Sequence, residues 1–246
     1  LCLPYVFSKR PEWDKFAGAY YTISIDVLMP SGRTLQIGSI HQYRDNFAKP
    51  YEISYETENG THAFCHQTTY GMSERLLGAL IGVHGDNKGL LLPPEVAPLQ
   101  VVIIPIIFKG KEQAVLETST CLQKKLLEEN VRSTIDDREI TPGNKYYDWE
   151  LKGVPLRVEI GPKDVEKNEL TLVRRDNGKK KAIPLKDAEK TIQTELQELE
   201  QSLYANAEKL LKENMHTALT IEEAAQKNGI VALPWCGKKD CALEIE

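Results

Sequence analysis

The stretch TYGMSERLLGALIGVHGDNKGLLLPPEVAP, residues 69–98, decides the fold expected for this chain. The apolar run Leu76–Val83 predicts a helix. Ser73 suits its N-terminus, because a serine hydroxyl can accept a hydrogen bond from an amide that has no partner inside the helix. The polar and glycine-rich segment Gly85–Gly89 then predicts a turn. The apolar residues Leu90–Leu92, which two prolines follow, predict a short extended segment.

Arg75 is the charged residue of this predicted helix, and two interpretations of it remain open. Gly78 and Gly82 lie four residues apart, so one helix face is bare enough to press onto a sheet. A guanidinium group held on such a buried helix is suited to a planar or phosphate ligand. The pattern alone favours the simpler interpretation, a core helix whose arginine extends to water.

The segment GVHGDNKGLLLPPEVAP, Gly82–Pro98, resembles motif 3 of the class II aminoacyl-tRNA synthetases. In detail it is similar to prolyl-tRNA synthetases of the archaeal and eukaryotic type. The resemblance implies that ATP and Mg²⁺ are used to attach L-proline to tRNA(Pro) through a prolyl adenylate. It also implies that Arg75, at the arginine position of the motif, is catalytic and contacts the ATP phosphates. Ser73 and Glu74 fall where related enzymes carry polar residues at the nucleotide edge.

An antiparallel β region is predicted before this stretch, because apolar and polar residues alternate between turn signals. Gln36, Ser39 and His41 line up along one segment of it, and a polar strand face or a loop in solvent is the plain interpretation. The predicted strands are Tyr21–Leu28, Thr34–Gly38 and Pro50–Thr57.

Residues 15–18, 36–41 and 46–47 match the proline-pocket region of prolyl-tRNA synthetases. Proline is small and zwitterionic, so a pocket can select it by shape and a few polar contacts. Ser39 replaces the usual threonine and keeps the hydroxyl, whereas Tyr43–Asp45 depart from the Leu-Gly pair of the family. The resemblance implies that the amino acid and adenosine are surrounded by Phe16, Gln36, Ser39 and His41.

Residues 99–198 predict an α/β domain, because strand patterns alternate with helix patterns. In residues 154–161 the apolar Leu156, Val158 and Ile160 alternate with Arg157 and Glu159, which predicts a strand with one charged face. The other predicted elements are strands at 99–108, 131–136 and 169–175, helices at 110–130 and from 141, a hairpin turn at 176–178, a strand at 179–185 and a long charged helix at 186–214.

The run Trp149–Asp164, WELKGVPLRVEIGPKD, resembles the anticodon-binding domain of class IIa synthetases, which has a mixed five-stranded sheet. Carboxylates can accept hydrogen bonds from guanine N1 and N2, and lysine or arginine can donate to O6 and N7. A solvated charged strand face is the plain alternative, above all for Lys179–Lys181. The resemblance implies that the anticodon guanines are contacted by Glu150, Arg157, Lys163, Asp164 and Lys179.

Composition places the chain among ordinary globular proteins, since 41% of its 246 residues are hydrophobic and 27% are charged. The net charge of −5 argues against a purely electrostatic nucleic-acid binder, and no DNA partner is expected. No apolar run reaches the length of a membrane span, and the first residues lack signal-peptide features. The five cysteines, an odd count, fit a reducing compartment, so a cytoplasmic location is expected.

Cys236 and Cys241 form a C-x₄-C pair, which is half of a tetrahedral zinc site. Two free thiols on a loop fit the pattern equally well. The resemblance favours zinc, because archaeal-type prolyl enzymes carry a C-terminal zinc-binding domain in which a C-x₂-C pair follows the first pair. The second pair is absent from residues 199–246, so this α+β domain is expected to be incomplete.

The resemblance implies three domains: residues 1–98 as the C-terminal part of a class II catalytic domain built on an antiparallel sheet, 99–198 as the anticodon-binding domain, and 199–246 as the zinc-binding type. Motifs 1 and 2 are expected before Leu1, so the chain is interpreted as the C-terminal portion of a homodimeric enzyme and is expected to be inactive alone. Two alternatives remain. Another class IIa synthetase, such as the threonyl or histidyl enzyme, would share the anticodon-binding domain but lack the Phe16–Phe47 pattern. A non-catalytic tRNA-binding paralogue would lack Arg75 and the pocket.

Overall fold

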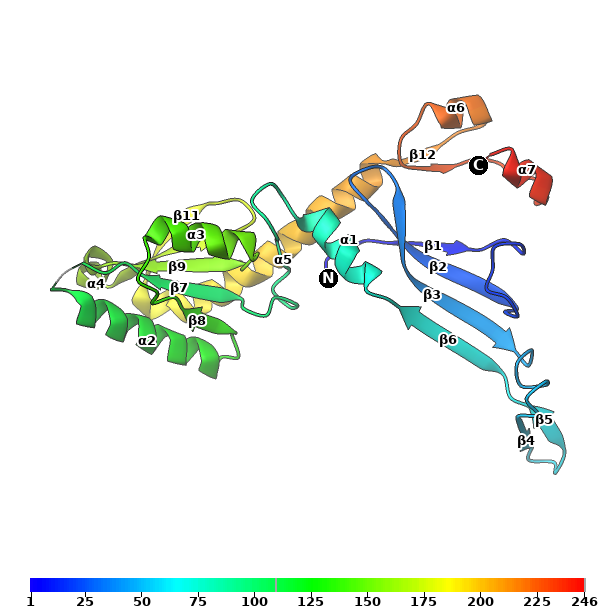
Figure 1. Cartoon of the computed structure of the whole chain (residues 1–246), viewed down its shortest axis with the longest axis horizontal. Coiled ribbons are helices and arrows are strands. Elements are labelled where there is room, and N and C mark those ends of the chain that lie inside the picture. The colour runs from blue at the N-terminus through cyan, green and yellow to red at the C-terminus, as the bar shows by residue number, and fades with distance from the viewer. Residues whose placement is uncertain (109, 246) are drawn as a thin grey trace. The chain divides into compact units, whose positions relative to one another are not determined.

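The computed structural model describes residues 1–108 and 110–245, which form two compact units (Figure 1). The α/β unit comprises residues 1–2 and 83–207, and the β-sheet unit comprises residues 3–82 and the described residues from 208 onward. Helices α1 (Arg75–His84) and α5 (Ala188–Glu213) each continue from one unit into the other. Within the described ranges, no helix is both long and apolar enough to cross a membrane.

A five-stranded mixed sheet forms the centre of the α/β unit. Its strands are β7 (Val101–Pro105), β8 (Ser133–Ile135), β9 (Leu156–Ile160), β10 (Glu169–Arg174) and β11 (Lys180–Pro184), in the spatial order β11-β10-β9-β7-β8. Helices α2 (Glu112–Glu128), α3 (Pro142–Leu151) and α4 (Pro162–Lys167) and the short 3₁₀ helix η1 (Leu185–Asp187) complete the unit with α5. β7 pairs in parallel with β8 and β9, and α2 and α3 supply the crossovers that parallel neighbours need. The expected mixed sheet is confirmed.

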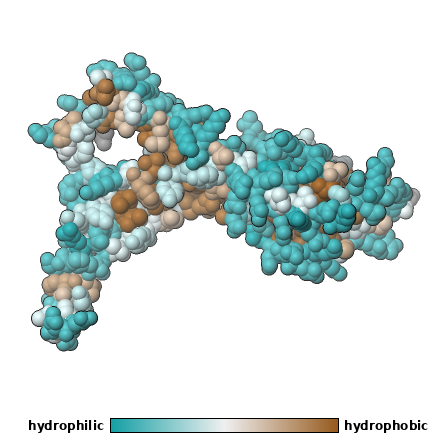
Figure 2. Space-filling model, turned by 180° about the vertical axis from the view of Figure 1, so that it is seen from behind, coloured by the Kyte–Doolittle hydropathy of each residue, from teal (hydrophilic) through white to brown (hydrophobic). Residues whose placement is uncertain are grey.

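Alternation along β9 divides its side chains between two environments. Leu156, Val158 and Ile160 are fully buried in the main core, which the apolar stripes of α2 and α5 complete. Arg157 and Glu159 point to the opposite face, where Arg157 contacts α3. The charged face predicted for this strand is therefore confirmed, although both charged residues are buried. The surface of the α/β unit that Figure 2 shows is largely hydrophilic, which agrees with its many charged residues.

The β-sheet unit contains a four-stranded antiparallel sheet in the order β1-β2-β3-β6. Its strands are β1 (Val6–Lys9), β2 (Tyr21–Leu28), β3 (Thr34–Arg44) and β6 (Gln67–Met72). The smaller elements are the hairpin of β4 (Ser54–Glu56) and β5 (His62–Phe64), the parallel pair β12 (Met215–Thr217) and β13 (Ile230–Ala232), and the short helices α6 (Ile221–Ala225) and α7 (Lys239–Leu243).

Two sequence-based expectations are met only in part. Of the strand predicted over 50–57, only β4 (Ser54–Glu56) forms. Residues 45–52 form turns instead, and Glu52 adopts a left-handed conformation with φ of 54°. Helix α1 is buried on one face only: Ala79 and Leu80 are buried, whereas Leu77 is 61% exposed and Ile81 is 49% exposed. Of its two glycines, only Gly82 is packed closely, against the side chain of Met29.

Within the α/β unit, the turn at 85–89 is held in place by backbone and side-chain contacts with later parts of the chain. The amide of Leu90 donates to the carbonyl of Leu151 at 3.0 Å, so the predicted extended segment is present but forms no regular strand. The Arg175 guanidinium donates to both carboxylate oxygens of Asp86, at 2.8 and 2.6 Å. Hydrogen bonding from this guanidinium lowers the pKa of Asp86 to about 2.

Candidate functional site

A β-bulge in β3 places three of the expected pocket residues on one face of the sheet. Ser39 and His41 are two residues apart and so share a face, whereas Gln36 would face the other way in a regular strand. The pairing register shifts between Gly38 and Gln36, so Gln36 pairs with Asp26 while Ser39 pairs with Ser24. The bulge therefore returns Gln36 to the face of Ser39 and His41.

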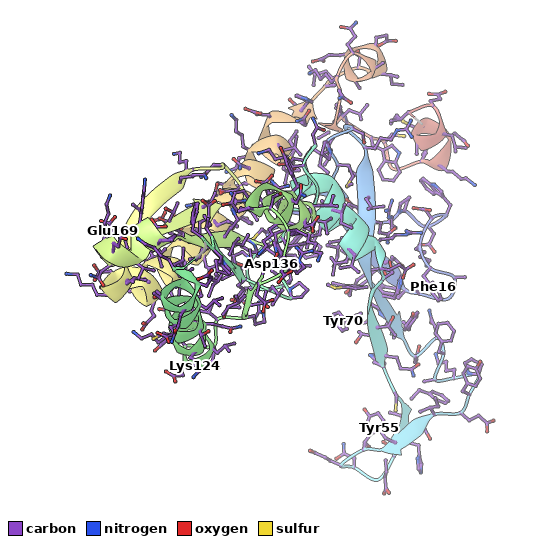
Figure 3. All side chains as sticks on the ribbon, turned by 60° about the vertical axis from the view of Figure 1, so that its left-hand side comes forward. Phe16, Tyr55, Tyr70, Lys124, Asp136 and Glu169 are labelled. Carbon is purple, nitrogen blue, oxygen red and sulfur yellow. The ribbon has the colours of Figure 1, made fainter. Side chains whose placement is uncertain are left out.

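His41 is the centre of the first polar cluster on this face. Its Nδ1 lies 2.9 Å from the Thr22 hydroxyl oxygen, and its Nε2 lies 3.0 Å from the Ser39 hydroxyl oxygen. The Phe16 ring packs at a tilt on the His41 ring, with the ring centres 4.9 Å apart. The structure thus brings Phe16, Ser39 and His41 together, and Figure 3 shows Phe16 and Tyr70 on opposite sides of the sheet.

A hollow beside this cluster offers room for a small ligand. It is lined mainly by aromatic rings and hydroxyl groups, and its volume is about 640 Å³. Tyr43 is 8% exposed and packs edge-on against Phe47, with ring centres 4.8 Å apart. A small apolar ring can be held there by shape, with a few polar groups to orient it. The lining residues are Phe16, Tyr43, Phe47, Tyr51, His66, Gln67, Thr68 and Thr69.

Gln36 belongs to a second polar cluster on the same face. Arg10 donates to the Gln36 side-chain oxygen at 3.3 Å and to the Asp26 carboxylate at 3.4 Å. The Ser24 hydroxyl donates to the other Asp26 oxygen at 2.5 Å. Arg10 and Asp26 also line a hollow of about 530 Å³. Sequence reasoning missed Arg10, Asp26 and Thr22, although pairing β2 against β3 would have placed Thr22 and Asp26 opposite the predicted residues.

Arg75 is the first residue of α1 and is exposed. The amide of Arg75 donates to the Ser73 hydroxyl at 3.4 Å, so the expected interaction of Ser73 with the helix start is present but long. β6 ends at Met72, which pairs with Gly38, so the chain reaches Arg75 at the Gln36 end of β3. Ser73 and Glu74 are exposed beside it, and none of these three residues lines the two hollows described above.

Arg157 is the centre of a charged cluster in the α/β unit. It donates to Glu159 at 3.0 Å and to Glu150 at 3.3 Å, and its guanidinium lies 4.0 Å from the centre of the Tyr146 ring. Lys180 donates to both Glu159 oxygens, at 3.2 and 3.3 Å. Burial, with the negative charge of Glu159, raises the pKa of Tyr146 to about 12. The cluster joins two expected anticodon residues to three that sequence reasoning missed.

The strand register explains why Lys180 joins this cluster. Arg157 pairs with Val173, which pairs with Lys180, so the two basic side chains lie in one row across the sheet. Lys179 precedes this row and is exposed in the turn, where its amide donates to Asn177 at 2.9 Å.

The two expected contacts on α4 occupy different environments. Lys163 is exposed, whereas Asp164 accepts a hydrogen bond from the Gly161 amide at 2.7 Å through its Oδ2 atom. This bond caps the start of α4, so Asp164 stabilises the helix in addition to any contact with RNA. Within the described ranges, no direct hydrogen bond or ion pair joins Lys163, Asp164 or Lys179 to Arg157.

The two cysteines near the C-terminus do not form a complete metal site. Both are free thiols; Cys236 is exposed and Cys241 is partly buried. Residues 1–108 and 110–245 contain no group of three or more His, Cys, Asp or Glu arranged to hold a metal ion. Two thiols do not fit a structural zinc ion, which takes four ligands.

Comparison with known proteins adds independent information. Residues 100–195 match the family described as "Anticodon binding domain". The chain is 50% identical over 250 residues to a proline–tRNA ligase of Thermococcus kodakarensis and 47% identical over 250 residues to one of Pyrococcus abyssi. It is 46% identical over 248 residues to a proline–tRNA ligase of Methanosarcina mazei. Each alignment covers 100% of this chain but 52% of the relative, so the chain spans about half the length of these proteins.

Proposed function

Because this chain contains an anticodon-binding domain and is homologous along its whole length to archaeal proline–tRNA ligases, we propose that it forms part of an enzyme that attaches L-proline to tRNA(Pro). The reaction would use ATP and pass through a prolyl adenylate. The observation that carries the proposal is the grouping of Phe16, Ser39 and His41 on one face of the antiparallel sheet. The chain also combines this pocket with an anticodon-binding domain, as an enzyme that joins an amino acid to tRNA requires.

The proposed roles follow from the chemistry of the two steps. In the first step a carboxylate oxygen of proline attacks the α-phosphate of ATP, and pyrophosphate leaves. Phe16 packs on the proline ring, Ser39 and His41 orient the reacting end, Gln36 contacts the substrate from the second cluster, and Ser73 and Glu74 border the nucleotide. Arg75 binds the phosphates, where Mg²⁺ bound with ATP would neutralise further negative charge. In the second step a ribose hydroxyl of tRNA(Pro) attacks the adenylate, and AMP leaves.

We further propose the three-domain division at residues 98 and 198. The first part would be a portion of a class II catalytic domain, with the remaining catalytic motifs supplied by sequence that these 246 residues do not contain. Homodimerisation remains a prediction of the family resemblance, and a cytoplasmic location remains a prediction from the cysteine content. Prolylation of a tRNA(Pro) transcript by the intact protein tests the proposed reaction. Transcript binding without adenylate formation would instead indicate a non-catalytic tRNA-binding paralogue.

Glu150 provides a test of the anticodon proposal. Glu150→Gln preserves the size of the side chain but turns one acceptor oxygen into a donor, which conflicts with the donors at guanine N1 and N2. We expect kcat/KM for tRNA(Pro) to fall by roughly 5–150-fold, the equivalent of about 1–3 kcal/mol for a base contact. Proline-dependent pyrophosphate exchange should stay unchanged.

The matched control for this substitution is Glu128→Gln, at an exposed position on α2. It should alter neither half-reaction. Equal losses of exchange and charging in Glu150→Gln would show that Glu150 supports the fold and does not read the anticodon.

Zinc remains a proposal for the intact protein, with Cys236 and Cys241 as two of four ligands. We expect elemental analysis to find about one equivalent of zinc in the intact protein, since structural sites take four ligands. A Cys236→Ser, Cys241→Ser double variant should lose it. A full equivalent in the double variant, or no zinc in wild type purified without chelator, would show that these cysteines are not ligands.

A further inference from the structure

Thr22 is a buried residue of β2 that contacts two of the proposed pocket residues. It is 3% exposed. Its hydroxyl oxygen accepts a hydrogen bond from the backbone amide of Phe16 at 3.0 Å, and it lies 2.9 Å from Nδ1 of His41. It therefore connects the segment that carries the Phe16 ring to the strand that carries His41.

The direction of the bond to His41 follows from counting protons. A threonine hydroxyl has one proton to donate and two lone pairs that can accept. The Phe16 amide can only donate, so it occupies one lone pair. The Thr22 proton needs an acceptor, because a buried polar group without a partner costs about 1–3 kcal/mol. Among the hydrogen bonds of the described residues, Nδ1 of His41 is the acceptor within its reach.

The same count favours one tautomer of His41. When Nδ1 accepts, a neutral imidazole carries its proton on Nε2. That proton is donated to the Ser39 hydroxyl oxygen, which lies 3.0 Å from Nε2. The proton of Ser39 is then left to be donated to something else. Gly71 is the register partner of Ser39 on β6, and a β-carbon at Gly71 would lie 3.9 Å from the Ser39 hydroxyl oxygen, so the glycine leaves space beside that hydroxyl.

We propose that Thr22 is a positioning residue of the amino-acid site, which holds His41 in the Nε2-protonated form and so presents the Ser39 hydroxyl as a hydrogen-bond donor to a substrate oxygen. This inference rests on the proposed function for the identity of the substrate, a carboxylate or acyl oxygen of proline. The relay runs from the Phe16 amide through Thr22 and His41 to Ser39. It explains why a buried threonine contacts both Phe16 and His41.

The experiment compares Thr22→Val, which keeps the shape without the hydroxyl, with Thr22→Ser, which keeps the hydroxyl. Nitrogen NMR of His41 should show an unprotonated Nδ1 and a protonated Nε2 in wild type and in Thr22→Ser. In Thr22→Val a population with protonated Nδ1 should appear. In the intact protein, KM for proline in pyrophosphate exchange should rise about tenfold in Thr22→Val, the loss expected for one hydrogen bond. It should stay within about twofold of wild type in Thr22→Ser, with kcat changed less than KM in Thr22→Val.

Several outcomes would overturn the proposal. A wild-type His41 protonated on Nδ1 would do so directly, without any variant. Equal impairment of Thr22→Val and Thr22→Ser would show that Thr22 acts through packing alone, and an unchanged KM in both would show that the relay does not reach the substrate. Wild-type protein that exchanges pyrophosphate with another amino acid but not with proline would refute the proposed function, while the NMR comparison would still decide the state of His41.

Discussion

Replacing Arg75 with alanine is expected to lower proline-dependent ATP–pyrophosphate exchange by the intact protein about 10²–10³-fold, as for the loss of one group that stabilises transition-state charge. Negative charge moves onto the departing pyrophosphate in this reaction, and a guanidinium fixed at the phosphates would stabilise it. Arg75 is exposed at the start of α1, so the variant should stay folded. The measurement is exchange at saturating proline, with thermal unfolding as the check on folding.

The control for Arg75 is Arg75→Lys, which keeps the charge but loses the planar, two-pronged donor. We expect activity between that of wild type and that of Arg75→Ala. Exchange kinetics unchanged in Arg75→Ala would mean that Arg75 is simply a solvated arginine at the start of α1.

Replacing Asp136 with alanine should cause the largest loss of stability, about 3 kcal/mol, because it removes a buried carboxylate that accepts several hydrogen bonds, including those of the half-exposed Arg138. The Asp136 side chain is 1% exposed and accepts bonds from Arg138 at 2.7 and 2.9 Å and from Trp149 at 2.7 Å. It ties the loop after β8 to α3, the helix that carries Glu150 and Tyr146. Figure 3 labels Asp136 in the α/β unit. Chemical denaturation monitored by tryptophan fluorescence measures the change.

Asp148→Ala is the matched control. Asp148 also accepts a bond from Arg138, at 2.9 Å, but the Asp148 side chain is 45% exposed. It should cost less than about 1 kcal/mol, as exposed pairs do. Hydrogen bonds from Arg138 hold the pKa of Asp136 well below its ordinary value. A lowered pKa stabilises the fold above the unfolded-state pKa of about 3.9, and this stabilisation is lost as pH falls below that value. Equal losses in the free energy of unfolding for Asp136→Ala and Asp148→Ala would show that the burial of Asp136 does not matter.

The α/β unit was largely predictable because its signals are local. Residues 154–161 alternate strictly, and the Asp176-Asn177-Gly178 turn connects β10 and β11 as expected. The predicted helix at 110–130 corresponds to α2, whose buried residues recur every three or four positions. Each of these patterns depends on a few consecutive residues, so tertiary context had little opportunity to override it.

The site was less predictable because it depends on strand pairing. Gln36 shares a face with Ser39 only because of a bulge whose position is set against β2. In the sequence Thr22 is an ordinary strand residue, and only the pairing of β2 with β3 shows that it lies opposite His41. The family resemblance points to Lys179, whereas only the register of β10 with β11 shows that Lys180 lies in the row of Arg157. The roles of all these residues in catalysis and recognition stay predictions.

The most direct test of the account is ATP–pyrophosphate exchange by the intact protein, measured with each of the twenty amino acids in turn. Exchange with proline is expected to be well above that with any other amino acid, because the Phe16 ring lines a hollow with room for a small apolar ring and packs on His41, which contacts Ser39. Exchange with threonine or histidine but not with proline would contradict the account.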